Sequence, residues 1–144
     1  MQQFDLIIIG GGPGGYLCAE RAGKAGLRTA LLEKSALGGT CLNEGCIPTK
    51  SLLYCAKQYQ TMMHCGEYGI TAQNISYDHA AAVARKDNIV QTLVRGVGAA
   101  MKKHGVTVFP VEGKIAGQTG DLFTVSAGEE LLYAPKLVLA SGSS

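Results

Sequence analysis

The chain has 144 residues, of which 47% are hydrophobic and 17% are charged, and its 13 Lys and Arg against 11 Asp and Glu give a formal net charge of +2. A disordered chain would show the opposite balance of apolar and charged residues, so this class is excluded. The small net charge, the absence of Trp and an aromatic content of 6% argue against a nucleic-acid partner.

The first residues and the cysteine content bear on the compartment. No apolar run reaches the ~18 residues of a membrane span, and the N-terminus lacks the basic and apolar regions of a signal peptide. The five cysteines are an odd number, which is unlike a secreted disulfide framework. We therefore expect a cytoplasmic protein without a membrane partner, in which any paired cysteines are redox-active, catalytic or metal-binding.

The N-terminal part of the chain has the pattern of a βαβ unit. Residues 4–9 form an apolar run that is typical of a strand covered on both faces. A glycine-rich turn at 10–15 follows, then a helical stretch to about Ala25 that Gly26 closes, and then a second strand at 29–33. Two strands joined by one helix within about 30 residues predict a parallel pair with a right-handed crossover.

The middle of the chain is predicted to be helical. A second glycine-rich turn at 38–48 leads into a helix to about Met63, and Pro48 is acceptable in its first turn. A long helix is predicted at 77–103, because apolar residues recur there along one face. These residues are Val83, Val90, Val94, Val97 and Met101.

The last part of the chain favours strands. A strand at 106–111 is interrupted by Pro110, and an apolar run at 136–140 predicts a final parallel strand. Between them lie three short runs, separated by glycine-containing turns, at 113–116, 122–126 and 130–133. The fold class is therefore α/β: a Rossmann-like domain with a parallel sheet, helices and a small antiparallel β-meander insertion.

The first glycine turn has the spacing of a dinucleotide-binding site. In Gly10-x-Gly12-x-x-Gly15 the first glycine permits a tight turn, the second lets the backbone approach a pyrophosphate, and the third lets helix and strand pack closely. Glu33 ends the second strand, where its carboxylate would accept hydrogen bonds from a ribose hydroxyl and repel a 2′-phosphate. The pattern predicts FAD or NAD rather than NADP, with a purely structural turn as the alternative.

Two of the cysteines are close in the sequence. Cys41 and Cys46 are five positions apart, which in an ideal helix separates their Cα atoms by about 8–9 Å, beyond the ~7 Å limit for a disulfide. A bridge would need a distorted turn, which Gly45 and Pro48 would allow. Lys50 lies four residues after Cys46, and together with the helix N-terminus it would lower the pKa of the Cys46 thiol. The pair is predicted to be redox-active. Metal binding is the alternative, although no convincing set of further ligands accompanies the pair.

The segment G-G-T-C-L-N-E-G-C-I-P-T-K at 38–50 closely resembles the active-site motif of the class I pyridine nucleotide–disulfide oxidoreductases. Within this family, Leu42, Asn43 and residues 47–50 look most like the dihydrolipoamide dehydrogenases. The glutathione and mercuric reductases share the glycines and cysteines but usually differ at these neighbours. The resemblance extends over the whole chain and implies that the nucleotide is FAD.

The resemblance also implies roles for individual residues. The implied catalytic residues are Cys46 as the flavin-proximal cysteine, Cys41 as the interchange thiol and Lys50 as the lysine near the reactive nitrogen of the flavin. No metal is expected. The same three residues count among the implied FAD contacts, and the closing Ala-Ser-Gly matches the Ala-Thr-Gly of the family. The other implied FAD contacts are Gly10, Gly12, Pro13, Gly14, Gly15, Glu33, Lys34, Gly39, Thr40, Gly113, Ala140, Ser141 and Gly142.

Family members usually continue into an NAD domain and a dimerisation domain. The resemblance therefore implies that residues 1–144 are the N-terminal FAD-binding part of a longer homodimeric enzyme and are inactive alone. Electrons would pass from dihydrolipoamide through the Cys41–Cys46 disulfide and FAD to NAD. The partner would be the lipoyl group of a 2-oxoacid dehydrogenase or glycine cleavage complex. The alternatives are a glutathione or mercuric reductase, an NAD-dependent dehydrogenase with the same glycine pattern, and a non-catalytic nucleotide-binding module whose cysteines only pack.

Overall fold

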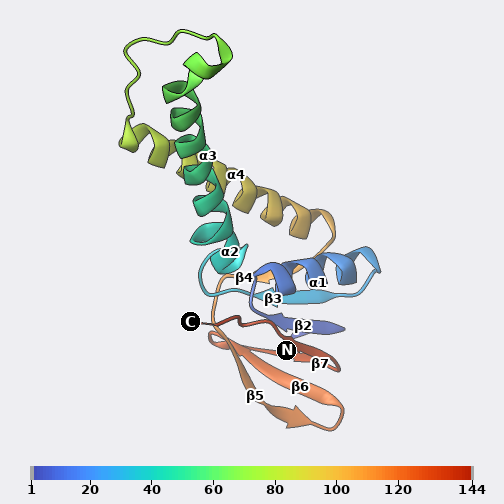
Figure 1. The fold of residues 1–144 in the computed structure, drawn as a ribbon. Helices are drawn as coiled ribbons and strands as arrows, with labels where there is room; N and C mark the ends of the chain where they lie inside the picture. Colours follow the sequence, from blue (N-terminus) through green and yellow to red (C-terminus); the bar gives the residue numbers. More distant parts are fainter. Residues whose placement is uncertain (1, 144) are drawn as a thin grey trace.

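A computed structural model describes residues 2–143 and contains a four-stranded parallel sheet at its centre (Figure 1). The strand order is β4-β3-β2-β8, so β2 has a partner on each side. The strands are β2 (Leu6–Ile9), β3 (Thr29–Leu32), β4 (Thr107–Phe109) and β8 (Leu137–Leu139). β4 is shorter than the predicted strand at 106–111 and ends before Pro110, which has no N–H to donate to a neighbouring strand.

A second sheet is built mainly from the predicted meander. It contains β5 (Gly113–Thr119), β6 (Leu122–Ala127) and β7 (Glu130–Ala134) in antiparallel pairing. A fourth strand, β1 (Gln2–Gln3), pairs in parallel with β7. The chain therefore contributes its first described residues to the meander and its next strand to the parallel sheet.

Helices lie on one side of the parallel sheet and extend beyond it (Figure 1). They are α1 (Pro13–Lys24), α2 (Gly39–Asn43), α3 (Cys46–Met63), the short 3-10 helix η1 (Cys65–Tyr68) and α4 (His79–Lys103). α4 starts two residues later than predicted, because the Asp78 carboxylate accepts a hydrogen bond from the Ala81 N–H and caps the helix. α3 and the first part of α4 form an arm that projects beyond the sheets, while the last part of α4 packs on α1 and the parallel sheet (Figure 1).

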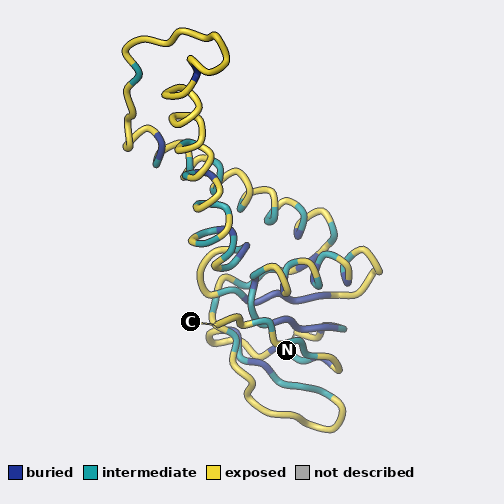
Figure 2. The backbone as a smooth tube through the Cα atoms, in the orientation of Figure 1, coloured by how far each residue is buried: buried dark blue, intermediate teal, exposed yellow. Residues whose placement is uncertain are grey.

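The core consists of two apolar clusters, one on each face of the parallel sheet. Alternate residues of β2 divide between them: Ile8 faces α1 and α4, whereas Ile7 faces the antiparallel sheet. Both side chains are fully buried, and each such burial contributes about 1.5–3 kcal/mol. Figure 2 shows this burial concentrated in the sheets, while most of the α3–α4 arm is exposed. The order of layers is therefore helices, parallel sheet, antiparallel sheet.

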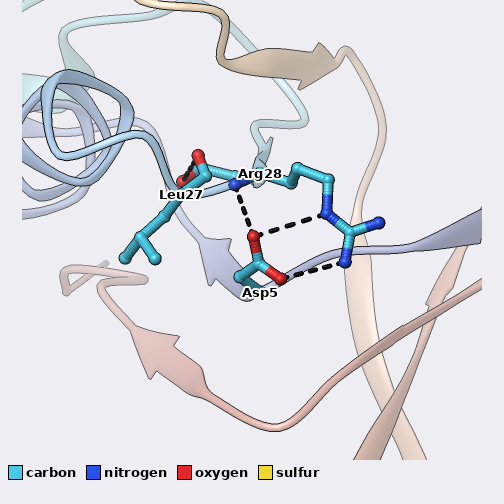
Figure 3. A network of polar contacts seen from close by, with 4 residues as sticks. Asp5, Leu27 and Arg28 are labelled. Atoms are coloured by element: carbon cyan, nitrogen blue, oxygen red, sulfur yellow. Dashed lines mark hydrogen bonds and ion pairs between the residues drawn. The ribbon is translucent and has the colours of Figure 1, made fainter.

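An ion pair joins the starts of the two central strands. The Arg28 guanidinium donates to Asp5 Oδ1 at 2.9 Å, and the Arg28 backbone N–H donates to Asp5 Oδ2 at 2.8 Å (Figure 3). These hydrogen bonds hold the pKa of Asp5 below its ordinary value. The pair lies at the amino ends of β2 and β3, opposite the edge where the glycine turns gather.

The predicted α/β class is confirmed, with its parallel sheet, helices and antiparallel meander. Between residues 2 and 143, no helix combines the length and the apolar character that a membrane crossing requires.

Candidate functional site

The carboxyl ends of the parallel strands meet at one edge of the sheet. Backbone hydrogen bonds continue the pairing just past the strands: Gly10 N–H donates to Leu32 O at 2.8 Å, and Ala140 N–H donates to Ile9 O at 2.8 Å. After β2 the chain continues to β3, which pairs with one edge of β2, while β8 pairs with the other edge. Such a change of direction at the carboxyl edge is where open α/β sheets bind ligands.

The glycines of the first turn lie in very close contact with their surroundings. Gly10 has a φ of +105°, and a Cβ there would lie 2.2 Å from the carbonyl oxygen of Ala140. A Cβ on Gly15 would lie 1.7 Å from the carbonyl oxygen of Gly10. No side chain fits at either position, so these two glycines allow α1 to begin directly against the end of β2.

Gly12 differs from these two because it has open space beside it. A Cβ at Gly12 would meet nothing closer than the Cα of Gly39, at 3.8 Å. Gly39 belongs to the second glycine turn, and the two turns are joined by a hydrogen bond from Gly38 N–H to Gly11 O at 2.8 Å. Gly12 caps α1, whose first N–H groups have no partner within the helix. The two turns thus leave exposed backbone and a helix N-terminus, which together suit a phosphate.

Glu33 lies beside this backbone, as the sequence predicts. Its Oε2 accepts a hydrogen bond from Gly11 N–H at 2.7 Å, and its Oε1 accepts one from Ser35 N–H at 2.8 Å. Each carboxylate oxygen can accept two hydrogen bonds and accepts one of these, so each could still accept a hydrogen bond from a ribose hydroxyl. The carboxylate is thus fixed next to the glycine turn by two backbone hydrogen bonds.

The remaining predicted contacts lie around the same edge. Gly113 packs on β2 and β3, since a Cβ there would lie 2.8 Å from a methyl group of Leu32. Lys34 is exposed, and its Nζ lies 4.0 Å from a Glu112 carboxylate oxygen. Pro13 and Gly14 open α1, while Ser141 and Gly142 continue from β8 with their side chains or Cα exposed. The predicted contact residues named here, which are far apart in the sequence, therefore lie near one edge of the sheet.

Cys41 and Cys46 lie on either side of a break between two helices. α2 ends at Asn43, and α3 begins at Cys46. In between, the chain turns back on itself: the N–H groups of Glu44 and Gly45 both donate to Thr40 O, at 2.9 and 2.7 Å. A continuous helix would hold the cysteines apart. This break, which lies where Gly45 was expected to allow it, brings Cys46 near enough to Cys41 for its thiol to be the main influence on the pKa of Cys41.

The structure holds the pair as two free thiols, with Cys41 half-buried and Cys46 exposed. A hydrogen bond with the Cys46 thiol is the main cause that raises the pKa of Cys41, and partial burial adds to the rise. The Lys50 ammonium lowers the pKa of Cys41, but by less. The predicted effect of Lys50 on Cys46 stays a prediction, and at Cys41 the partner thiol outweighs the effect of Lys50.

Replacing Cys46 with alanine is expected to lower the pKa of Cys41, because it removes the largest cause of the rise. The Cys41 thiolate then becomes more abundant below its pKa, and alkylation at about pH 7.5 should accelerate several-fold. Lys50→Gln should have the opposite effect. Mass spectrometry of the Cys41 peptide during iodoacetamide treatment under reducing conditions measures both rates. Cys55→Ala serves as the control, and slower alkylation in Cys46→Ala would contradict the prediction.

The other cysteines lie outside this pair. Cys18 and Cys55 are half-buried, Cys65 is buried, and all three are free thiols. Within the described range 2–143, no three or more His, Cys, Asp or Glu side chains gather into a possible metal site.

Comparison with known proteins decides the family. The model of the pyridine nucleotide-disulphide oxidoreductases matches residues 4–144. The chain belongs to this family.

Curated relatives in the family share a name. The chain is 38% identical to a dihydrolipoyl dehydrogenase of Cupriavidus necator, over 99% of this chain and 32% of the relative. It is 44% identical to one from Pseudomonas aeruginosa, over 96% of this chain and 31% of the relative. It is 41% identical to a mitochondrial dihydrolipoyl dehydrogenase of Arabidopsis thaliana, over 96% of this chain and 28% of the relative. The chain thus spans about a third of the length of these relatives.

One residue of the family motif has contacts that the sequence did not reveal. The Asn43 side chain donates to the carbonyl oxygens of Leu37 at 3.1 Å and Gly39 at 3.0 Å. Both acceptors are backbone atoms, whose positions depend on the fold of the second glycine turn. The sequence carries no signal for them beyond the place of Asn43 between the two cysteines.

Proposed function

We propose that this chain is the FAD-binding part of a dihydrolipoyl dehydrogenase and that Cys41 and Cys46 form its redox-active disulfide. The observation that carries the proposal is the helix break between Cys41 and Cys46, which brings the two thiols near each other. The pair lies beside a nucleotide-binding edge, because Gly39, two residues before Cys41, contacts Gly12. The names of the relatives support the choice of substrate class.

The residues at the sheet edge fit FAD. Gly12 leaves backbone open to a pyrophosphate, whereas Gly10, Gly15 and Gly39 lie in close contact with neighbouring backbone atoms. Glu33 would accept a hydrogen bond from the ribose, and Lys50 and both cysteines would lie toward the flavin. FAD supplies a two-electron acceptor that NAD would reoxidise in the longer enzyme. This fit agrees with the family to which the chain belongs.

The two cysteines would carry out thiol–disulfide exchange with a dithiol such as dihydrolipoamide. A substrate thiolate attacks the Cys41 sulfur, the Cys41–Cys46 bond breaks, and Cys46 leaves as a thiolate. The second substrate thiolate then attacks the substrate sulfur of the mixed disulfide and releases Cys41. The substrate is oxidised to a cyclic disulfide by loss of two electrons, and the protein pair gains them. The two substrate protons pass to the two released thiolates or to water.

A thiol count on the 144-residue chain tests the proposal. After oxidation by glutathione disulfide and unfolding, the wild-type chain should show two fewer titratable thiols than the five cysteines of its sequence. One equivalent of dihydrolipoamide should restore all five. Peptide mapping should place the bridge between Cys41 and Cys46, and Cys55→Ser should retain it as the control.

Two outcomes would overturn this function. If Cys41 and Cys46 stay reduced under oxidising conditions, the chain is a nucleotide-binding module whose cysteines only pack. If the bridge forms but glutathione reduces it faster than dihydrolipoamide does, a glutathione reductase is favoured instead.

The wider setting of the enzyme is part of the same proposal. The longer enzyme would be a homodimer with an NAD domain, acting on the lipoyl group of a 2-oxoacid dehydrogenase or glycine cleavage complex. The odd number of cysteines is unlike a secreted disulfide framework and supports a cytoplasmic setting, where the disulfides that do form are usually catalytic or redox-sensing. The 144-residue chain alone is expected to show no steady-state oxidation of dihydrolipoamide by NAD, since it has no second nucleotide fingerprint after the first.

A further inference from the structure

The short helix α2 carries Cys41, and little of its own sequence stabilises it. It has five residues, and isolated helices of this length are unstable in water. Its N-cap is Gly38, in a left-handed conformation with φ of +101°, and no side chain caps it. Something other than helix propensity must therefore fix the position of Cys41.

Asn43 supplies that support from the last position of α2. Its amide nitrogen donates to Leu37 O and to Gly39 O, which uses both of its hydrogens. Carbonyl oxygens accept and never donate, so the nitrogen and not the oxygen of the amide must face them. The side chain thus ties the end of α2 back to the turn that precedes it.

This turn is itself anchored to the nucleotide-binding edge. Gly38 N–H donates to Gly11 O, and the Cα of Gly39 lies against Gly12. The Leu42 side chain is buried and fills the space beside Gly38. Asn43 therefore completes a rigid connection from the first glycine turn to the helix that bears Cys41.

We propose that Asn43 is a positioning residue that sets the reduction potential of the Cys41–Cys46 pair. This inference rests on the proposed function of the pair. By fixing α2 against the glycine turn, Asn43 holds the Cys41 sulfur next to Cys46 while both are reduced. This raises the effective concentration of one thiol at the other and so favours the disulfide.

The test is a redox titration of the 144-residue chain in buffers of reduced and oxidised glutathione. In this reaction two protein thiols become a disulfide while glutathione disulfide becomes two glutathione thiols. Asn43→Asp places a carboxylate against two carbonyl oxygens and removes both donors. We expect the equilibrium constant for disulfide formation to fall about tenfold, which is a shift of about 30 mV for a two-electron couple. Asn88→Asp, the same change at an exposed position of α4, should leave it unchanged.

The outcomes separate this inference from the function on which it rests. If the wild-type chain forms no Cys41–Cys46 disulfide, the proposed function fails. If it forms one and Asn43→Asp has the wild-type potential, only the role of Asn43 is wrong. Should Asn43→Asp unfold, Asn43→Ser removes the long amide without adding charge and is titrated in its place. Unfolding of both variants would show a general structural role and overturn the proposal.

Discussion

Replacing Gly15 with alanine is expected to cost about 3 kcal/mol or more, a large part of the stability of a domain this size. A Cβ there would lie 1.7 Å from the carbonyl oxygen of Gly10 and 2.9 Å from its carbon. Both are backbone atoms at the end of β2, so no side chain can move aside. α1 would have to shift away from the sheet. Urea unfolding followed by circular dichroism measures the loss.

Gly96→Ala is the matched control, because it makes the same change inside α4. Nothing lies within 4 Å of a Cβ at Gly96, and alanine favours a helix over glycine by up to about 1 kcal/mol. The control should therefore be stabilised, while Gly15→Ala is destabilised. Equal stability of the two variants would contradict the packing of α1 against β2.

Gly12→Ala is expected to preserve the fold and to weaken FAD binding by about 100-fold. The new methyl has room in the protein, since its nearest neighbour is the Cα of Gly39 at 3.8 Å. The backbone here is extended, with φ of −72° and ψ of −175°, which alanine adopts without strain. The methyl would occupy the space through which a pyrophosphate reaches the backbone. Flavin fluorescence during titration with FAD gives the affinity, and ADP serves as a second probe.

We expect Gly12→Ala to change FAD affinity and leave the free energy of unfolding unchanged. Gly96→Ala should change the free energy of unfolding and leave FAD affinity unchanged. Urea unfolding of Gly12→Ala should therefore match the wild type within about 0.5 kcal/mol. Unchanged FAD affinity in a folded Gly12→Ala chain would place the pyrophosphate elsewhere.

Much of this fold could be predicted because its signals are local. The apolar runs of β2 and β3, the glycine spacing between them and the regular apolar face of α4 each follow from nearby residues. The same holds for the helix break at Gly45, since a bridge at that spacing requires a distorted turn. The start of α4 could also have been placed better, because Asp78 is a typical N-cap residue.

What the sequence could not predict depends on contacts between distant segments. β1 consists of Gln2 and Gln3, which show no apolar alternation, and it exists because β7 offers its edge. The hydrogen bonds of Asn43 depend on where two carbonyl groups lie after the second glycine turn has folded. The raised pKa of Cys41 likewise comes from a neighbour that only the folded turn brings into contact.

The pairing of β2 with β8 has a consequence for synthesis on the ribosome. Ile8 lies opposite Val138, which is translated 130 residues later. Throughout that interval, one side of an entirely apolar strand has no partner in the nascent polypeptide, and such an edge invites association with other chains. The central sheet therefore cannot be completed before Leu139 has been translated. The speed of translation determines how long the free edge of β2 remains exposed to other chains.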